Sequence, residues 1–220
     1  VRSGVDVLPR VEGVTYCAFV DPSGGRKDSF TLGIAHQENG LRILDLVVER
    51  KPPFSPAMVA AEFASIARGY GCGTVTGDRY AGQFVPDAFR DAGMGYEPSA
   101  LVKSEIYLAA GPLFASSVVE VPANKKLVAQ LRGLERRTAR GGRDSIDHPP
   151  SGHDDLANAA CGALRLARFN VASEEVKPKW QSDYFTGMPT PAAARYIATG
   201  EPRPPAPMHK NISSRSKVNC

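Results

Sequence analysis

Residues 151–160 read Ser-Gly-His-Asp-Asp-Leu-Ala-Asn-Ala-Ala, and the rest of the chain is best interpreted around this stretch. It follows a Pro-Pro pair and opens a segment of small residues, which predicts a loop that leads into a closely packed helix. An aspartate at a helix start is a common cap, because its side-chain oxygen accepts hydrogen bonds from the first free N–H groups. Asp154 and Asp155, preceded by His153, carry more charge than a cap requires.

The composition is that of a globular protein with a slightly basic surface. The 220 residues are 42% hydrophobic and 23% charged, which suits one domain with a substantial core. A net charge of +4 permits a nucleic-acid partner without requiring one. No apolar run approaches the roughly 20 residues of a membrane span, and no signal-peptide pattern opens the chain. The 4 cysteines are scattered without a C-x-x-C pair, so we expect free thiols in a reducing compartment.

The first part of the chain predicts three antiparallel strands followed by alternating helices and strands. Strand-like runs cover residues 16–20, 29–36 and 41–48, and Asn39-Gly40 between the last two is the signal of a tight hairpin. Further along, we expect helices over about 56–70, 81–92 and 104–114, and strands near 72–76, 96–102 and 118–121. This order is typical of an α/β protein with a mixed sheet covered by helices.

The last part of the chain predicts a basic helix, a polar segment and a final helix. Residues 124–137 have helical periodicity, and residues 138–150 predict a loop or hairpin. Beyond residue 171 the periodicity fades and 7 of the prolines cluster. We therefore expect one domain over residues 1–172 and a Pro-rich, basic, flexible tail over residues 173–220.

Two further aspartates follow strand-like runs upstream of the Asp154-Asp155 pair. Asp21 follows the first predicted strand and Asp78 follows the fourth. Because sites in α/β proteins gather at strand ends, we expect these carboxylates to meet in one pocket. Clustered carboxylates repel one another and persist together around cations, and all-oxygen ligands suit Mg²⁺ or Mn²⁺. Two such ions about 4 Å apart are an arrangement that hydrolyses phosphodiesters. The alternative at each position is an ordinary turn or cap.

A cluster of basic residues precedes the acidic motif. Arg132, Arg136 and Arg140 are spaced i, i+4 and i+8, which forms one stripe if the helix continues that far. Basic side chains beside a carboxylate cluster hold DNA phosphates near the metals. No aromatic residues alternate with them, which favours contact with a duplex backbone over stacking on a single strand. The candidate DNA contacts are Arg79, Lys103, Arg132, Arg136, Arg137, Arg140 and Arg143.

Three segments resemble the nuclease domain of tailed-phage terminase large subunits. They are FVDPSGG (19–25), VTGDRYAG (75–82) and LRGLERRTARGGRDSIDHPPSGHDDLANAACGAL (131–164). The resemblance runs from about residue 16 to 169. It implies the RNase H-like fold shared with retroviral integrases and Holliday-junction resolvases. In that fold a mixed central sheet has three antiparallel strands, then parallel strands, and is flanked by helices.

The resemblance also implies an activity: a metal-dependent endonuclease that cuts concatemeric double-stranded viral DNA during genome packaging by a two-metal mechanism. By this likeness Asp21 and Asp78 are metal ligands, and the Asp154-Asp155 pair supplies the third carboxylate for two Mg²⁺ or Mn²⁺ ions. Resolvase-like relatives place the ligand at the start of a D-x-x-x-x-A pattern, which favours Asp154 and leaves Asp155 an auxiliary role. His153 is a further ligand, a phosphate contact or a solvent-facing residue.

The ATPase half of such proteins has no counterpart in this sequence. No G-x-x-x-x-G-K-[ST] phosphate loop occurs, and the chain begins at Val1 rather than Met. We therefore expect it to be the nuclease half of a longer protein. Its expected partners are double-stranded DNA, an N-terminal ATPase motor, a small terminase subunit and a portal, and its expected location is the host cytoplasm.

Three other functions stay open on the sequence alone. A resolvase-type nuclease would prefer branched DNA over linear duplex. A phosphotransferase of the actin and sugar-kinase type shares the sheet topology, but it should show a second glycine-rich phosphate turn, which we do not find. A non-catalytic DNA-binding assembly module would use its carboxylates only as caps and turns.

Overall fold

The computed structural model describes residues 1–2, 4–78, 82, 84–138, 142, 144–150 and 152–167. The predicted tail over residues 173–220 lies outside this part of the chain, so the boundary at residue 172 stays a prediction. Three of the candidate DNA contacts, Arg79, Arg140 and Arg143, also lie outside it.

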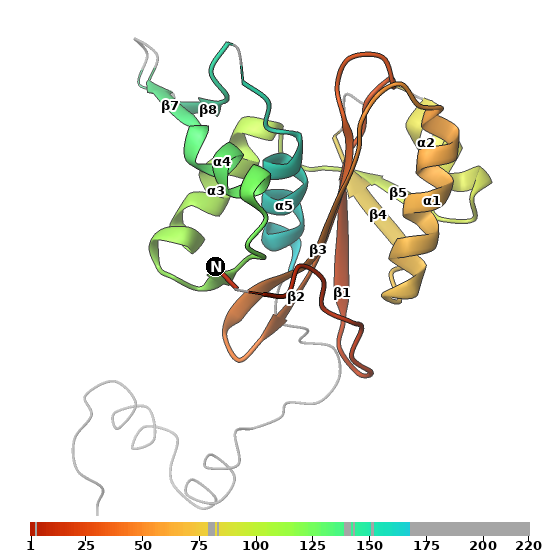
Figure 1. The fold of residues 1–220 in the computed structure, drawn as a ribbon, viewed down its shortest axis with the longest axis horizontal. Helices are drawn as coiled ribbons and strands as arrows, with labels where there is room; N and C mark the ends of the chain where they lie inside the picture. The colour runs from red at the N-terminus through yellow and green to blue at the C-terminus, as the bar shows by residue number, and fades with distance from the viewer. Residues whose placement is uncertain are drawn as a thin grey trace, which may run out of the picture. The chain divides into compact units, whose positions relative to one another are not determined.

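Three antiparallel strands form the centre of the molecule, as the sequence predicts (Figure 1). They are β1 (Tyr16–Asp21), β2 (Phe30–Glu38) and β3 (Leu41–Arg50). The hairpin between β2 and β3 turns at Asn39 and Gly40, whose φ angles of 48° and 82° are both positive. Asparagine and glycine tolerate this left-handed conformation better than other residues, which is why this dipeptide marks the turn.

Parallel strands extend the sheet at both edges. β4 (Thr74–Gly77) pairs with β1, β5 (Gly95–Pro98) pairs with β4, and β6 (Val119–Glu120) pairs with β3. The strand order in the six-stranded sheet is β5-β4-β1-β2-β3-β6. The predicted fold class is therefore confirmed.

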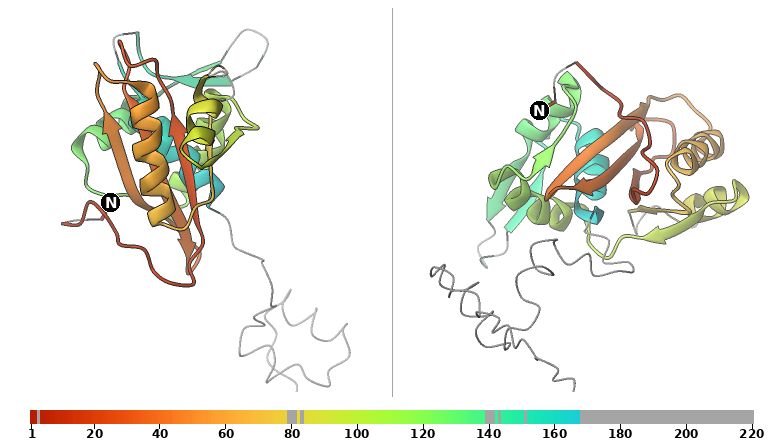
Figure 2. Two further views of the ribbon diagram at one scale, coloured as in Figure 1. Left: turned by 90° about the vertical axis from the view of Figure 1, so that its right-hand side faces the viewer. Right: turned by 90° about the horizontal axis from the view of Figure 1, so that it is seen from below.

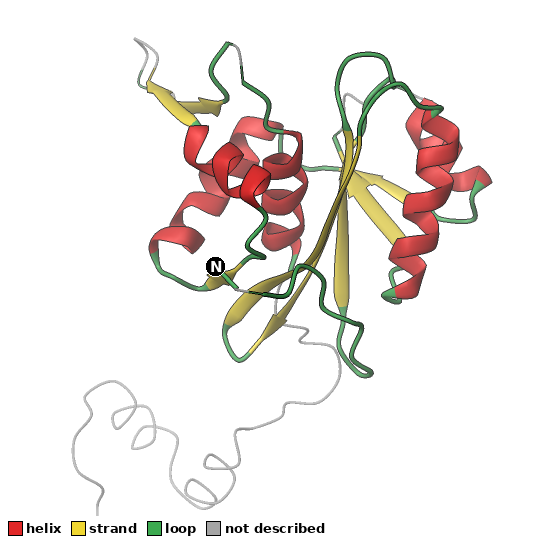
Figure 3. Cartoon of the chain, in the orientation of Figure 1, coloured by secondary structure: helices red, strands yellow, loops and turns green. Residues whose placement is uncertain are grey.

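Helices cover both faces of the sheet (Figures 2 and 3). On one face lie α1 (Pro56–Gly69) and α2 (Phe84–Asp91), and on the other lie α3 (Lys103–Ala115), α4 (Lys125–Gly133) and α5 (Asp155–Leu166). In the described part of the chain, no helix combines the length and the apolar character that crossing a membrane would need.

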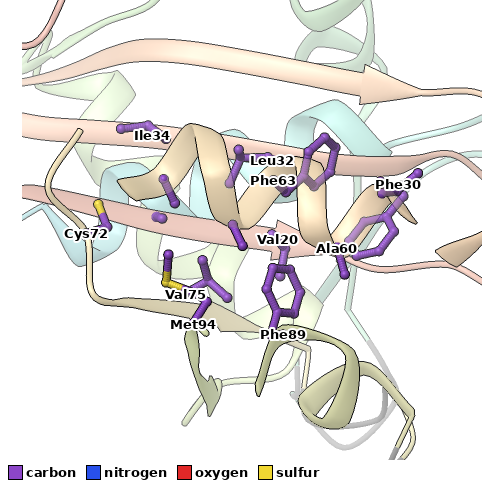
Figure 4. Close-up of a cluster of buried hydrophobic side chains, with 14 of the residues drawn as sticks. Val20, Phe30, Leu32, Ile34, Ala60, Phe63, Cys72, Val75, Phe89 and Met94 are labelled. Atoms are coloured by element: carbon purple, nitrogen blue, oxygen red, sulfur yellow. The ribbon is translucent and has the colours of Figure 1, made fainter. Parts of the chain in front are cut away.

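Each face of the sheet has its own apolar core. Between the sheet and α1 and α2, the ring of Phe30 packs edge-on against Phe63 with centroids 5.2 Å apart, and Val20 and Phe89 are fully buried with them (Figure 4). The core under α3, α4 and α5 includes Phe19, Leu44, Ile106, Leu127 and Leu164. A sheet that is apolar on both faces explains why its strands read as continuous hydrophobic runs.

The predicted helix over residues 124–137 is wrong over its last four residues. Helix α4 ends at Gly133, and Leu134 is extended, with ψ at 131°. The chain continues as β7 (Glu135–Thr138), which pairs with β8 (Asp144–Asp147) in a two-stranded antiparallel hairpin. Glycine disfavours helix, but Leu134 still packs against the same core as the α4 leucines, so the apolar spacing hides the change. Arg132 and Arg136 therefore do not share a helical stripe.

The predicted strand near residues 96–102 is also shorter in the structure. It ends at Pro98, and α3 begins at Lys103. The N–H of Ser99 still donates a hydrogen bond of 2.7 Å to the carbonyl oxygen of Gly77, and pairing stops because β4 itself ends at Gly77.

Helix α5 lies unusually close to β1 and β2. A Cβ atom on Gly33 would be 2.5 Å from the carbonyl oxygen of Ala159, and one on Gly162 would be 2.3 Å from the ring of Phe19. Both glycines therefore leave room that the facing element fills. The hydroxyl of Thr31 in β2 donates a hydrogen bond of 2.8 Å to the carbonyl oxygen of Asp155, which fixes the start of the helix against the sheet.

We expect Gly162→Ala to lower the free energy of unfolding by about 1–3 kcal/mol, because the added methyl group would overlap the Phe19 ring. Gly111 in α3 is the matched control, because the space around its Cβ position is open. Gly111→Ala should be neutral or stabilising by up to about 1 kcal/mol, since alanine is the better helix former. Urea unfolding curves measure both effects, and equal shifts would contradict the close contact.

Candidate active site

Asp21 and Asp78 lie side by side at the C-terminal ends of two neighbouring strands. β1 and β4 are parallel, and Val20 faces Gly77 in the last pair of their register. Asp21 is the final residue of β1, and Asp78 directly follows β4. The hydroxyl of Tyr96 donates a hydrogen bond of 2.8 Å to the carbonyl oxygen of Asp78, which fixes the backbone at this point. The structure thus brings the two predicted carboxylates to one edge of the sheet.

The start of α5 brings the second pair of carboxylates to the same edge. Thr31, which holds the carbonyl of Asp155, is also the residue that faces Asp21 in the register of β1 and β2. Asp154 occupies the N-cap position, but its side chain makes no capping hydrogen bond. The side chain of Gln130 caps the helix instead and accepts a hydrogen bond of 3.1 Å from the N–H of Ala157. The alternative that Asp154 is only a cap is therefore ruled out by the geometry.

Asp154 is buried and held by two residues of α3. The ammonium group of Lys103 lies 3.2 Å from Oδ1 and 3.1 Å from Oδ2 of Asp154, and the hydroxyl of Tyr107 donates a hydrogen bond of 2.8 Å to Oδ2. Burial on its own would lower the pKa of Lys103, but the carboxylates of Asp154 and Asp147 outweigh it and the pKa is raised. Lys103 is therefore a charged partner of Asp154.

A cavity of about 370 Å³ joins these groups. It has five carboxylates and the single ammonium group of Lys103 on its described wall, together with His148 and the exposed His153. The residues that line it are Asp21, Pro22, Ser23, Gly24, Asp28, Ser29, Asp78, Lys103, His148, Gly152, His153, Asp154 and Asp155. All four predicted catalytic aspartates, His153 and Lys103 thus share one cavity.

Burial and neighbouring negative charges raise the pKa of two of these carboxyl groups. Burial raises the pKa of Asp21 to about 8, a hydrogen bond from the side chain of Asn158 opposes the rise, and the carboxylate of Asp155 adds to it. Burial and the adjacent Asp154 also raise the pKa of Asp155. Because both pKa values are raised, a second negative charge in the cavity is unfavourable unless a cation binds there.

Three residues of this region escaped the sequence prediction, namely Asp147, His148 and Asn158. Among the residues that the structure describes, Asp147, His148 and Asp154 are the group whose potential metal-binding atoms lie within 4.8 Å of one another. Asp147 is the last residue of β8, and His148 follows it directly before a Pro-Pro pair. A carboxylate and an imidazole side by side at a strand end were the sequence pattern that could have indicated this group. Asn158 was also missed, although its spacing of four residues from Asp154 places both on one helical face.

A second cavity, of about 700 Å³, has a different character. It lies between α3, α4 and the β7–β8 hairpin and is lined mainly by apolar side chains, among them Phe114, Val128, Leu131 and Ile146. The described residues that line it include no carboxylate, whereas those of the acidic cavity include five.

The basic candidates of α4 and the hairpin lie outside the described wall of the acidic cavity. Arg132, Arg136 and Arg137 are exposed. Arg136 pairs with Asp144 across the hairpin, and Arg137 lies 2.8 Å from Glu135 on its own strand. Their role as DNA contacts stays a prediction.

Large terminase nucleases of several bacteriophages have a similar arrangement of strands and helices. The large terminase nuclease of the thermophilic phage G20c superposes with a TM-score of 0.64 at 18% identity, over 73% of this chain and 86% of that one. The large terminase nuclease domain of Thermus phage P74-26 superposes with a TM-score of 0.59 at 18% identity, over 73% and 81%. The chain has the fold of a large terminase nuclease. No protein-family model and no curated protein sequence matches it.

The terminase-nuclease fold also occurs as part of a longer protein and in metal-bound forms. The large terminase of phage HK97 superposes with a TM-score of 0.59 at 14% identity, over 74% of this chain but 41% of that one. The G20c nuclease has been solved with bound cobalt, magnesium and zinc.

The donor set of the acidic cavity fits a divalent cation. It consists of five carboxylate groups, whose oxygens divalent cations accept as ligands, together with the imidazole groups of His148 and His153. The raised pKa of Asp21 agrees with this fit, because burial disfavours its negative charge and a bound cation would offset that cost.

Without metal, Asp21 should make the protein less stable as pH rises from about 4 to about 8. Its folded pKa of about 8 lies above the ordinary value of 3.8, so in this window the folded state keeps a proton that the unfolded chain has lost. Asp21→Asn stays neutral, so its melting temperature in EDTA should exceed that of the parent chain at about pH 8 and converge with it below about pH 4.

Thermal melts across this pH range check the expectation. Asp87→Asn is the matched control, because Asp87 pairs with Arg90 on α2, outside the residues that line the acidic cavity. The control should follow the parent curve. A parent curve that does not diverge from Asp21→Asn would mean that Asp21 carries no unfavourable charge.

Proposed function

We propose that this chain is a metal-dependent endonuclease that cuts double-stranded viral DNA concatemers during genome packaging. The observation that carries the proposal is the meeting of carboxylates from β1, β4 and α5 in one cavity of a terminase-nuclease fold. Elements far apart in the sequence bring together carboxylates that repel one another. This arrangement is useful to the protein only if a cation binds between them.

The metal ligands are Asp21, Asp78 and the Asp154-Asp155 pair, with two Mg²⁺ or Mn²⁺ ions as cofactors. Bound ions of this kind lower the pKa of water and stabilise the oxygen that leaves a phosphodiester. The chain supplies the positions: β1 and β4 hold Asp21 and Asp78 in register, and Thr31 holds the start of α5 beside them. Asn158 orients the carboxylate of Asp21 through a side-chain hydrogen bond.

The substrate contacts come from the basic residues around the cavity. Lys103 on the cavity wall and Arg132, Arg136 and Arg137 on α4 and the hairpin would hold phosphates of the duplex. Contacts of this kind position the DNA without reading its sequence, so cleavage by the isolated chain should have little sequence preference.

The wider context follows from the same proposal. The HK97 protein with this fold is more than twice as long as the part that matches, so we place an ATPase motor elsewhere in the packaging machine. A small terminase subunit and a portal would complete it, in the cytoplasm of the host cell.

Asp21→Asn, Asp78→Asn and Asp154→Asn should each lower cleavage of supercoiled plasmid by about a thousandfold or more, because each removes a metal ligand. The parent chain should nick and linearise the plasmid with Mn²⁺ or Mg²⁺ and be inactive in EDTA. Asp87→Asn should retain full activity, because Asp87 lies outside the residues that line the cavity.

Gel assays of plasmid conversion check this, with circular dichroism to confirm that each variant is folded. Cleavage in EDTA, or full activity in the three aspartate variants, would contradict the proposed site. No cleavage by a folded, DNA-binding parent chain in either metal would exclude nuclease activity of the chain on its own.

Arg137→Ala should weaken binding to linear duplex DNA and reduce the slope of log affinity against log salt by about one for each phosphate that the variant no longer binds. Arg90→Ala on α2 is the matched control, because Arg90 is likewise exposed and paired with a nearby carboxylate but lies on the opposite face of the sheet. Fluorescence anisotropy at several salt concentrations measures both. Equal weakening in the two variants would assign the effect to net charge alone.

A further inference from the structure

Three side chains converge at the hairpin side of the acidic cavity. Nε2 of His148 lies 3.7 Å from Oδ1 of Asp154 and 3.8 Å from Oδ1 of Asp147. Two ligands at about 2.1 Å from an octahedral cation are about 3.0 Å apart when adjacent and about 4.2 Å apart when opposite. The observed separations lie between these values and are too long for hydrogen bonds, so a small shift of the side chains would let the three donors share one cation.

The ring of His148 is oriented for such a role. Its Nδ1 lies 2.8 Å from the carbonyl oxygen of Pro149. A carbonyl oxygen only accepts hydrogen bonds, so Nδ1 carries a proton, and Nε2 is the ring nitrogen that faces the two carboxylates. Two carboxylates this close to each other favour a positive charge between them.

Lys103 supplies that positive charge in the metal-free protein. Its ammonium group lies 3.3 Å from Oδ1 of Asp147 and 3.1 Å from Oδ2 of Asp154. Its side chain is 32% exposed, so the flexible stem can withdraw the ammonium group toward solvent. Tyr107 would keep Asp154 in place when Lys103 leaves, through its hydrogen bond of 2.8 Å.

The two adjacent aspartates of α5 serve different sides of the cavity. The charge of Asp155 acts on Asp21 more strongly than that of Asp154 does. Asp154 is bound instead by Lys103 and Tyr107 and lies beside Asp147 and His148. One cation position therefore lies toward Asp21 and Asp155, and another lies toward the hairpin.

We propose that Asp147, His148 and Asp154 form a divalent-cation site, and that the ammonium group of Lys103 occupies it until a metal ion displaces it. The inference rests on the nuclease function proposed above and deepens it, because it adds a cation site that shares Asp154 with the ligands of the two proposed ions. Metal loading then frees the Lys103 side chain for a DNA phosphate beside the bound ion.

Isothermal titration of the 220-residue chain with Mn²⁺ at about pH 8 tests the proposal without reference to cleavage. Lys103→Met should bind Mn²⁺ about tenfold more tightly, because a competing charge is removed. Lys103→Arg keeps the charge and should bind like the parent chain. Asp147→Asn should bind about tenfold more weakly, because it removes a ligand.

Two matched controls separate these effects from net charge. Lys125→Met removes an exposed lysine of α4, and Asp87→Asn removes a carboxylate of α2, both outside the residues that line the cavity. Neither should change Mn²⁺ affinity. Melting temperatures in EDTA and in Mn²⁺ provide a second readout: Lys103→Met should melt lower than the parent chain in EDTA and gain more from the metal.

The possible results separate the cation site from the nuclease function. Unchanged or weaker Mn²⁺ binding by folded Lys103→Met overturns the proposal, as does unchanged binding by Asp147→Asn. If those two results occur while Asp21→Asn still abolishes plasmid cleavage, the nuclease function stands and only this site falls. If the parent chain binds no Mn²⁺, both proposals fall together.

Discussion

The close contact between α5 and the strands β1 and β2 is the constraint on which the rest of the site depends. Gly33 and Gly162 remove the side chains that would hold helix and sheet apart, and Ala159 and Phe19 fill the space. At this short separation Thr31 can bond the carbonyl of Asp155 while it faces Asp21 across the ladder. A wider gap would break that bond and move two carboxylates away from the other two. The packing of small residues in α5 is therefore as important to the site as the charged residues themselves.

The site is held together against its own electrostatics. Five carboxylates and one ammonium group line the described wall of the cavity, and the pKa of Asp21 is raised by burial and, to a lesser extent, by the neighbouring carboxylates of Asp155 and Asp154. Apolar packing on both faces of the sheet provides the stabilisation that offsets this repulsion. Tyr107 and Lys103 hold Asp154, and Gln130 caps the helix in its place. The carboxylates are thus positioned before any cation arrives, which reduces the reorganisation that cation binding requires.

The β7–β8 hairpin connects the basic surface to the acidic cavity. Arg136 and Arg137 lie on β7, and β8 ends at Asp147, next to His148 on the cavity wall. The N–H of Ile146 donates a hydrogen bond of 2.8 Å to Ser104, so the base of the hairpin is attached to the first turn of α3, where Lys103 lies. A DNA duplex bound to the hairpin would therefore act on the same short segment that, by our inference, holds one cation.

The sequence by itself determined the order of the elements and the carboxylates at their ends. The strand-like runs, the Asn39-Gly40 turn and the position of Asp21 and Asp78 after strands all depend on local patterns, which neighbouring residues express without help from distant ones. Only the tertiary structure decided that α4 stops at Gly133, because Leu134 keeps the apolar spacing of the helix while its backbone is already extended. Only the tertiary structure, likewise, placed Lys103 between Asp147 and Asp154, and Asn158 against Asp21. Contacts between residues so far apart in the chain depend on how closely helix and sheet approach, and local spacing does not encode that distance.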